Sequence, residues 1–82
     1  MTKRVPKYVK AMTQAMKDFY EGYMVTTRRN EVNQFRIPQI VLDEGLLEGL
    51  EQLERFGQFC KVRGFKCEFG DEVGVILVSR AH

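Results

Sequence analysis

The chain has 82 residues, of which 44% are apolar, and its six phenylalanines and three tyrosines suffice for one packed core. We therefore expect a single domain over residues 1–82. The longest apolar run, Val75–Val78, is too short to cross a bilayer, and the first residues lack the apolar centre of a signal peptide. These features exclude a membrane-spanning or secreted class, and we expect a soluble, cytoplasmic protein.

Charge is sorted along the chain, although the net charge is only +2. Residues 1–36 carry eight basic and three acidic side chains, a net charge of +5. Residues 37–60 carry five acidic side chains and one basic side chain, a net charge of −4. Segregation of this kind gives a protein surfaces of opposite sign, which attract and orient charged partners.

The first predicted element is a two-faced helix that ends near Met24. Apolar residues recur at steps of three and four, as one face of a helix requires. They are Val5, Tyr8, Val9, Met12, Met16, Phe19, Tyr20 and Tyr23. The opposite face is basic and polar, with Lys3, Lys7, Lys10, Gln14 and Lys17. A five-turn helix offers more apolar surface than a small sheet can cover, so we expect part of this stripe to contact a partner.

An extended segment is predicted next, over Glu31–Val41, after a turn at residues 28–30. Its side chains alternate between polar and apolar, the pattern of a half-buried strand. Pro38 interrupts the pattern, and a proline cannot donate a ladder hydrogen bond, so this strand should be short or lie at a sheet edge. Asp43 has the side chain of a helix N-cap, which predicts the start of the next helix.

The second helix is predicted from about Glu44 toward Arg63, with Gly64 just beyond its end. The stripe expected to face the core comprises Leu46, Leu50, Leu53, Gly57 and Cys60, with Leu47 at its flank. Gly57 has two interpretations, because a glycine here can allow another backbone to approach closely or can break the helix.

A β-hairpin follows the second helix. Residues 65–69 alternate strictly, so Phe65, Cys67 and Phe69 should be buried, and Gly70-Asp71 predicts a tight turn. Val73–Ser79 is apolar on both faces, which predicts a central strand. The order α-β-α-β-β indicates an α+β fold with two helices packed on a small three-stranded antiparallel sheet.

The residues that carry enzyme chemistry are scarce in this chain. There is no phosphate-binding glycine motif, and the only histidine is His82. Cys60 and Cys67 cannot make a tetrahedral zinc site alone, and we expect two free thiols that pack as small apolar groups. We therefore expect no enzymatic activity, no metal and no cofactor.

The basic residues give the functional hypothesis. We expect a small regulatory protein that binds another protein with an acidic surface through its amphipathic first helix, and we expect it to form a homodimer. The expected contact residues are Lys7, Lys10, Lys17, Tyr20, Tyr23, Arg28 and Arg29.

Nucleic-acid binding through the same basic residues is the alternative hypothesis. If Gly57 splits the second helix, the element order resembles a winged helix, with residues 58–64 as the recognition helix and residues 65–79 as the wing. This resemblance implies that Gln58, Lys61 and Arg63 face the bases. The low net charge favours the protein-binding hypothesis instead.

Overall fold

The computed structural model describes residues 4–81, and Lys3 and His82 lie outside this range. Its elements are α1 (Lys7–Gly22), η1 (Met24–Thr26), β1 (Val32–Arg36), α2 (Gln39–Leu42), α3 (Leu46–Val62), β2 (Phe65–Phe69) and β3 (Val75–Arg80). The predicted α+β class, with helices on a three-stranded antiparallel sheet, is confirmed. The predicted order lacks only α2 and the short 3₁₀ turn η1.

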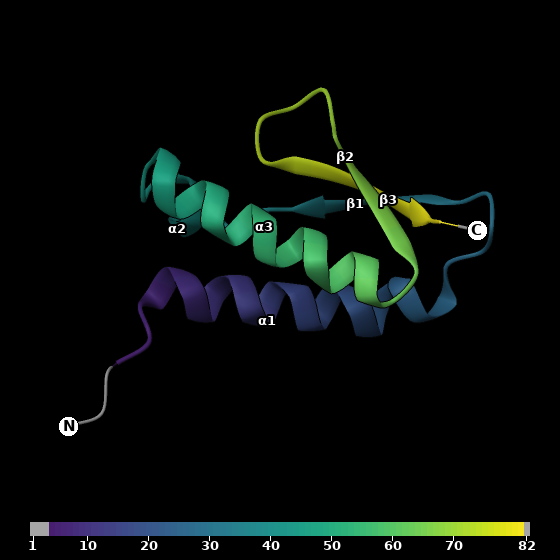
Figure 1. Ribbon diagram of the computed structural model, residues 1–82, viewed down its shortest axis with the longest axis horizontal. Helices are drawn as coiled ribbons and strands as arrows, with labels where there is room; N and C mark the ends of the chain where they lie inside the picture. The colour runs from purple at the N-terminus through teal and green to yellow at the C-terminus, as the bar shows by residue number, and fades with distance from the viewer. Residues whose placement is uncertain (1–3, 82) are drawn as a thin grey trace.

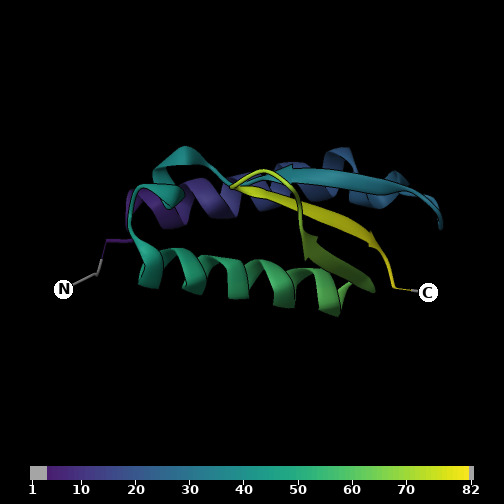
Figure 2. The ribbon, with the colours of Figure 1, turned by 90° about the horizontal axis from the view of Figure 1, so that it is seen from above.

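The sheet has the strand order β1-β3-β2, and both pairings are antiparallel. The apolar strand β3 is central, as its two apolar faces predicted. β1 lies at an edge and ends before Pro38, as expected for a strand followed by proline. Figures 1 and 2 show α1 and α3 side by side under one face of the sheet, with β1 nearer α1 and β2 nearer α3.

The core lies between this sheet face and the two long helices. Phe56 of α3 stacks on Phe35 of β1 with ring centroids 4.1 Å apart, and Phe19 of α1 meets Phe35 edge-on at 5.3 Å. Met12, Met24 and Val41 add fully buried side chains to the same cluster. The three aromatic rings therefore join α1, β1 and α3 into one apolar centre.

The segment after β1 differs from the sequence prediction. Residues 39–42 form the short helix α2 and not the end of an extended segment. Pro38 supplies the helix N-cap position, with backbone dihedrals that end the strand and start a turn. Asp43 is the C-cap of α2, where it accepts a hydrogen bond from Gln39 Nε2 at 2.9 Å. The N-cap of α3 is Gly45, whose φ of 98° suits glycine, so the predicted cap at Asp43 is wrong.

α3 is one unbroken helix that ends as predicted, with Gly64 at φ 82° beyond its C-cap. Gly57 therefore does not split it, and the short recognition helix of the winged-helix interpretation is absent from residues 4–81. The buried side chains of α3 are Gln52, Phe56 and Cys60. Gln52 accepts a hydrogen bond from Arg55 Nη1 at 2.5 Å, and Arg55 Nη2 reaches Thr13 of α1 at 2.9 Å.

The hairpin is looser than predicted. Residues 70–74 form a five-residue connection in place of a two-residue turn, closed by the hydrogen bond from Gly70 N to Val75 O. Val73 lies in this connection and is 93% exposed, so it is not part of the strand. Phe69 is 78% exposed at the end of edge strand β2, which contradicts its predicted burial.

Candidate functional site

The basic residues that the sequence singled out do not form one cluster. Lys7, Lys10 and Lys17 are exposed on α1, where a rise of 1.5 Å per residue spreads them over about 15 Å. Arg28 and Arg29 are exposed in the turn before β1. The lysines therefore line the helix, whereas the arginines lie beyond its C-terminal end.

The apolar stripe of α1 is largely used by the core, so the spare surface expected there is small. Met12, Met16 and Phe19 are buried, and Tyr20 is half-buried against Phe59 with ring centroids 6.1 Å apart. Tyr23 alone of the predicted contact tyrosines is mainly exposed, at 56%. α1 is thus a core helix with a basic outer face.

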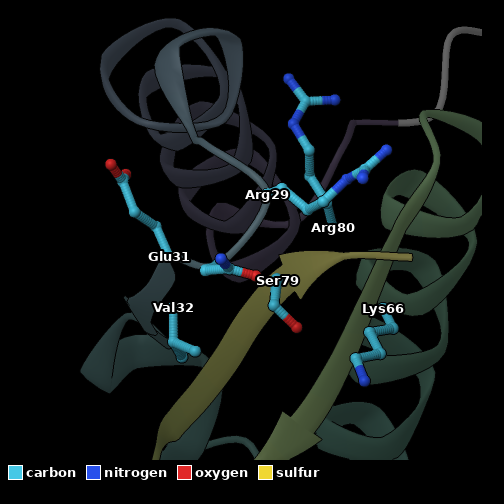
Figure 3. A pocket seen from close by; sticks show the side chains of 7 residues that line it. Arg29, Glu31, Val32, Lys66, Ser79 and Arg80 are labelled. Carbon is cyan, nitrogen blue, oxygen red and sulfur yellow. The ribbon is translucent and has the colours of Figure 1, made fainter. Parts of the chain in front are cut away.

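One candidate site is a cavity at the end of the molecule where β3 ends and β1 begins. It has a volume of about 590 Å³ and is lined by Arg29, Asn30, Glu31, Val32, Lys66, Ser79 and Arg80. Figure 3 shows Arg29 and Arg80 extending to the same side of it, with Glu31 on the opposite flank. Strand register places Lys66 and Val32 opposite Ser79 on one face of the sheet, whereas Arg80 lies opposite Phe65 and belongs to the other face.

Arg80 is held in place by its neighbours. Its Nε donates a hydrogen bond to the carbonyl oxygen of Thr27 at 2.7 Å, and its guanidinium lies 5.0 Å from the centre of the Phe65 ring. Thr27 is buried, its hydroxyl donates to Tyr23 O at 2.6 Å, and it accepts from Asn33 Nδ2 at 2.6 Å. These contacts fix the guanidinium of Arg80 at the edge of the cavity, and they occupy only its Nε–H with a hydrogen bond.

A second, adjoining cavity shares Arg80 with the first. It has a volume of about 370 Å³ and is lined by Tyr20, Met24, Val25, Arg63, Phe65 and Arg80. Arg63 lies 3.8 Å from the centre of the Phe59 ring and donates to Phe59 O at 3.0 Å. Cations therefore lie on both sides of Arg80, and we call Arg29, Arg63, Lys66 and Arg80 the basic end.

A different surface is found around α2 and the first half of α3. An apolar groove of about 310 Å³ is lined by Ile37, Val41, Leu42, Gly45, Leu46, Gly49, Leu50 and Leu53. Leu46 is 79% exposed, Leu47 is 76% exposed and Leu50 is 52% exposed. Leu46 and Leu50, predicted to face the core, instead line this leucine groove, whereas Leu53 lines it and also packs against the core as predicted.

Acidic residues accompany the leucine groove. α3 and the segment before it supply Asp43, Glu44, Glu48, Glu51 and Glu54, and the end of the β2–β3 hairpin supplies Glu68, Asp71 and Glu72. Partial burial, followed by the charges of Glu48, Glu51 and Glu44, raises the pKa of Tyr8 on neighbouring α1. Of these carboxylates, Glu72 pairs with Arg36 at 3.5 Å across exposed surface.

The cysteines do not form a reactive pair. Both are free, and Cys60 is fully buried, which raises the pKa of its thiol to about 12. A nucleophilic thiol needs the opposite shift. Within residues 4–81, no group of three or more metal-ligating side chains could hold a metal ion, and no helix is long and apolar enough to span a membrane.

Comparisons with protein-family models, with curated proteins and with solved structures found no significant match. The features that bear on function are therefore the two surfaces described above, the basic end and the leucine groove.

Sequence reasoning found only part of each surface. Arg29 was expected to bind a partner, but Lys66 and Arg80 were not, because only the register of β2 on β3 brings them to it. The signal that could have found them is the position of both cations at the same end of a predicted hairpin. Leu46 and Leu50 were predicted to be buried and are exposed, whereas the predicted core contact of Leu53 is present.

Proposed function

We propose that this chain is a small, non-enzymatic binding protein that docks a basic amphipathic helix of another protein into its leucine groove. The observation that carries this proposal is the exposure of Leu46, Leu47 and Leu50 along one helix of a small protein. Contiguous exposed apolar surface with a polar rim is characteristic of protein-interaction sites.

The charges around the groove favour one kind of partner. Along α3 and the segment before it, acidic residues are interspersed in sequence with the exposed leucines, including Asp43, Glu48, Glu51 and Glu54. A partner that fits this surface needs an apolar stripe flanked by Lys or Arg. The proposed partner is therefore basic, whereas the sequence led us to expect an acidic partner that binds the basic helix α1. We do not assign the contact to α1, because its apolar side chains are mostly buried in the core.

A second copy of the chain is a less suitable occupant. A twofold dimer would place the same surface on both sides of the contact, so acidic rim would face acidic rim. The basic α1 of another copy cannot supply the apolar stripe either, since Met12, Met16 and Phe19 are buried within its own fold. A cytosolic location belongs to this proposal, since a reducing compartment suits the free thiols of Cys60 and Cys67.

A synthetic peptide pair tests the proposal. We expect an amphipathic helix of leucine and lysine to bind in a fluorescence anisotropy titration, and its leucine–glutamate counterpart to bind at least about tenfold more weakly. The double variant Leu46→Gln/Leu50→Gln should lose at least about tenfold in affinity for the lysine peptide. Val62→Gln removes an exposed apolar side chain at the other end of α3 and serves as the matched control.

Three results would contradict the proposal. The first is equal affinity for the two peptides, and the second is an equal loss of affinity in the Val62→Gln control. The third is a dimer in analytical ultracentrifugation that Leu46→Gln/Leu50→Gln dissociates, because a second copy would then be the natural occupant of the groove.

A further inference from the structure

The basic end has a property that the proposed function does not use. Arg29, Lys66 and Arg80 come from three separate segments and line one cavity with the hydroxyl-bearing Ser79. Glu31 is the one carboxylate among the lining residues, and its Oε1 lies 3.8 Å from Nε of Arg28, which is not a lining residue. Among residues 4–81, Arg29, Lys66 and Arg80 form no ion pair with a carboxylate.

Gathering cations in this way is unfavourable unless an anion joins them, since like charges repel. The positions are nevertheless built into the fold. Arg80 is fixed through its Nε bond to Thr27 O and its contact with the Phe65 ring. A guanidinium oriented in this way presents two parallel N–H groups, which match two oxygens of a phosphate group.

The cations also extend beyond the reach of a single phosphate. Arg80 separates the cavity that holds Arg29 and Lys66 from the adjoining cavity that holds Arg63. Tyr20 lines the second cavity and its ring lies 5.3 Å from the Arg63 guanidinium carbon. Cations that line two adjoining cavities suit a flexible chain of phosphates better than one isolated phosphate on a peptide.

From this arrangement we propose that the basic end binds the phosphodiester backbone of a single-stranded nucleic acid, with successive phosphates at Arg29, Arg80 and Arg63, whereas Lys66 extends away from these arginines on the other face of the sheet (Figure 3). Recognition is through phosphates and is therefore independent of base sequence. No residue of the leucine groove takes part, so this site and the peptide-docking site can be tested separately.

The experiment is a fluorescence anisotropy titration of the full chain with a labelled oligothymidine of about 12 nucleotides, a length within the range of single-strand binding sites. We expect binding at low salt that weakens as salt is added. Three phosphate contacts correspond to a slope of about −2 in a plot of log affinity against log salt concentration. Arg29→Gln should lower the affinity several-fold and reduce that slope by about 0.7, the contribution of one contact.

Two further variants show whether the site or the overall charge is responsible. Lys10→Gln removes one positive charge from the exposed face of α1 and should leave affinity nearly unchanged. Arg80→Lys keeps the charge but loses the fixed guanidinium, so its affinity should fall below that of the parent. Because Arg80 also contacts Thr27, circular dichroism of this variant establishes that it is folded, and Arg29→Gln provides the test if it is not.

The proposal would be overturned by no binding at low salt, or by equal losses in Lys10→Gln and Arg29→Gln, which would indicate general charge attraction. Tighter binding of a duplex of the same length would assign the site to double-stranded nucleic acid and contradict the single-strand proposal. Binding of a phosphoserine peptide but not of oligothymidine would show that the site recognises an isolated phosphate on a protein.

Discussion

The two halves of α3 are similarly apolar in sequence and differ in the burial of their large apolar side chains. In residues 46–53, Leu46, Leu47 and Leu50 are mainly exposed, whereas in residues 54–62 the side chains of Phe56 and Cys60 are fully buried. The second half lies beside β2, which follows it in the chain and crosses over it, and the first half extends toward α2 (Figure 1). Burial along this helix is therefore decided by where the sheet lies, and a leucine stripe can be a binding surface as readily as a core.

The largest expected effect is in the second half of α3. Phe56→Ala removes a ring that stacks on Phe35 and meets Phe19 edge-on, and it leaves a cavity in the core. We expect the free energy of unfolding to fall by about 3–5 kcal/mol, as measured by urea denaturation. A loss below about 1 kcal/mol would show that this half of the helix is not the centre of the core.

Alkaline pH should destabilise the protein through Cys60 in the same half. Burial raises the pKa of this thiol from 9.0 to about 12, so above pH 9 the unfolded chain loses a proton that the folded protein retains. The stabilisation is complete below pH 9 and is lost as the pH rises toward 12, by up to about 1 kcal/mol per pH unit. Urea denaturation between pH 8 and pH 10.5 should show a steeper decline for the parent than for Cys60→Ala.

The matched variant Cys67→Ala is the control, because it also removes one free thiol, from a side chain that is only partly buried. If the free energy of unfolding fell equally steeply with pH in the parent and in Cys60→Ala, the buried Cys60 thiol would not be the cause of the alkaline destabilisation. Tyrosine ionisation occurs in the same pH range but is common to all three proteins, so the difference between their slopes isolates the thiol.

Two glycines allow the halves of α3 to be compared with the same substitution. An added Cβ at Gly49 or Gly57 would meet no atom within 4 Å, and both residues lie inside the helix. Each change to alanine should raise the free energy of unfolding by about 0.5–1 kcal/mol in urea denaturation. Gly49→Ala should also weaken binding of the lysine–leucine peptide, because Gly49 lines the groove, whereas Gly57→Ala should not.

The smallest expected effect is that of Leu46→Gln on stability. Leu46 is exposed, so its replacement should change the free energy of unfolding by less than about 0.5 kcal/mol, as measured by urea denaturation. Leu53→Gln is the comparison, because Leu53 packs against the core and its change should be clearly destabilising. Equal losses in the two variants would mean that the first half of α3 is needed for folding and is not a free surface.

Much of the fold could be predicted from local patterns. The apolar spacing of residues 5–24 located α1, and the apolar segment near Val75 correctly indicated the central strand. Local patterns could not show that Gln52 is buried while Leu46 is exposed, because burial depends on how α3 packs on the other elements. Arg55, which donates a hydrogen bond to Gln52, also donates one to Thr13 of α1. Neither could they show that Pro38 starts a helical turn, because that depends on how the chain leaves β1.

The candidate sites were harder to predict than the fold. Arg29 was identified from the charge of the first third of the chain, but Arg80 is far away in sequence and reaches the same cavity only through the pairing of β1 with β3. Charge segregation along the sequence did not indicate the basic end, because Arg63, Lys66 and Arg80 all lie outside the positively charged first 36 residues. The acidic segment, residues 37–60, does contain the helix that carries the leucine groove.

The central position of β3 has a consequence for how the chain acquires its structure. β1 and β2 each pair with β3 and not with one another, so neither strand has a partner until residues 75–80 are available. During synthesis, α1 and α3 can form from local contacts before any part of the sheet exists. β1 must then close a loop of about 40 residues to reach β3, and such long-range closure slows folding relative to a hairpin. The nascent protein is therefore helical first, and its sheet assembles only after residues 75–80 have been synthesised.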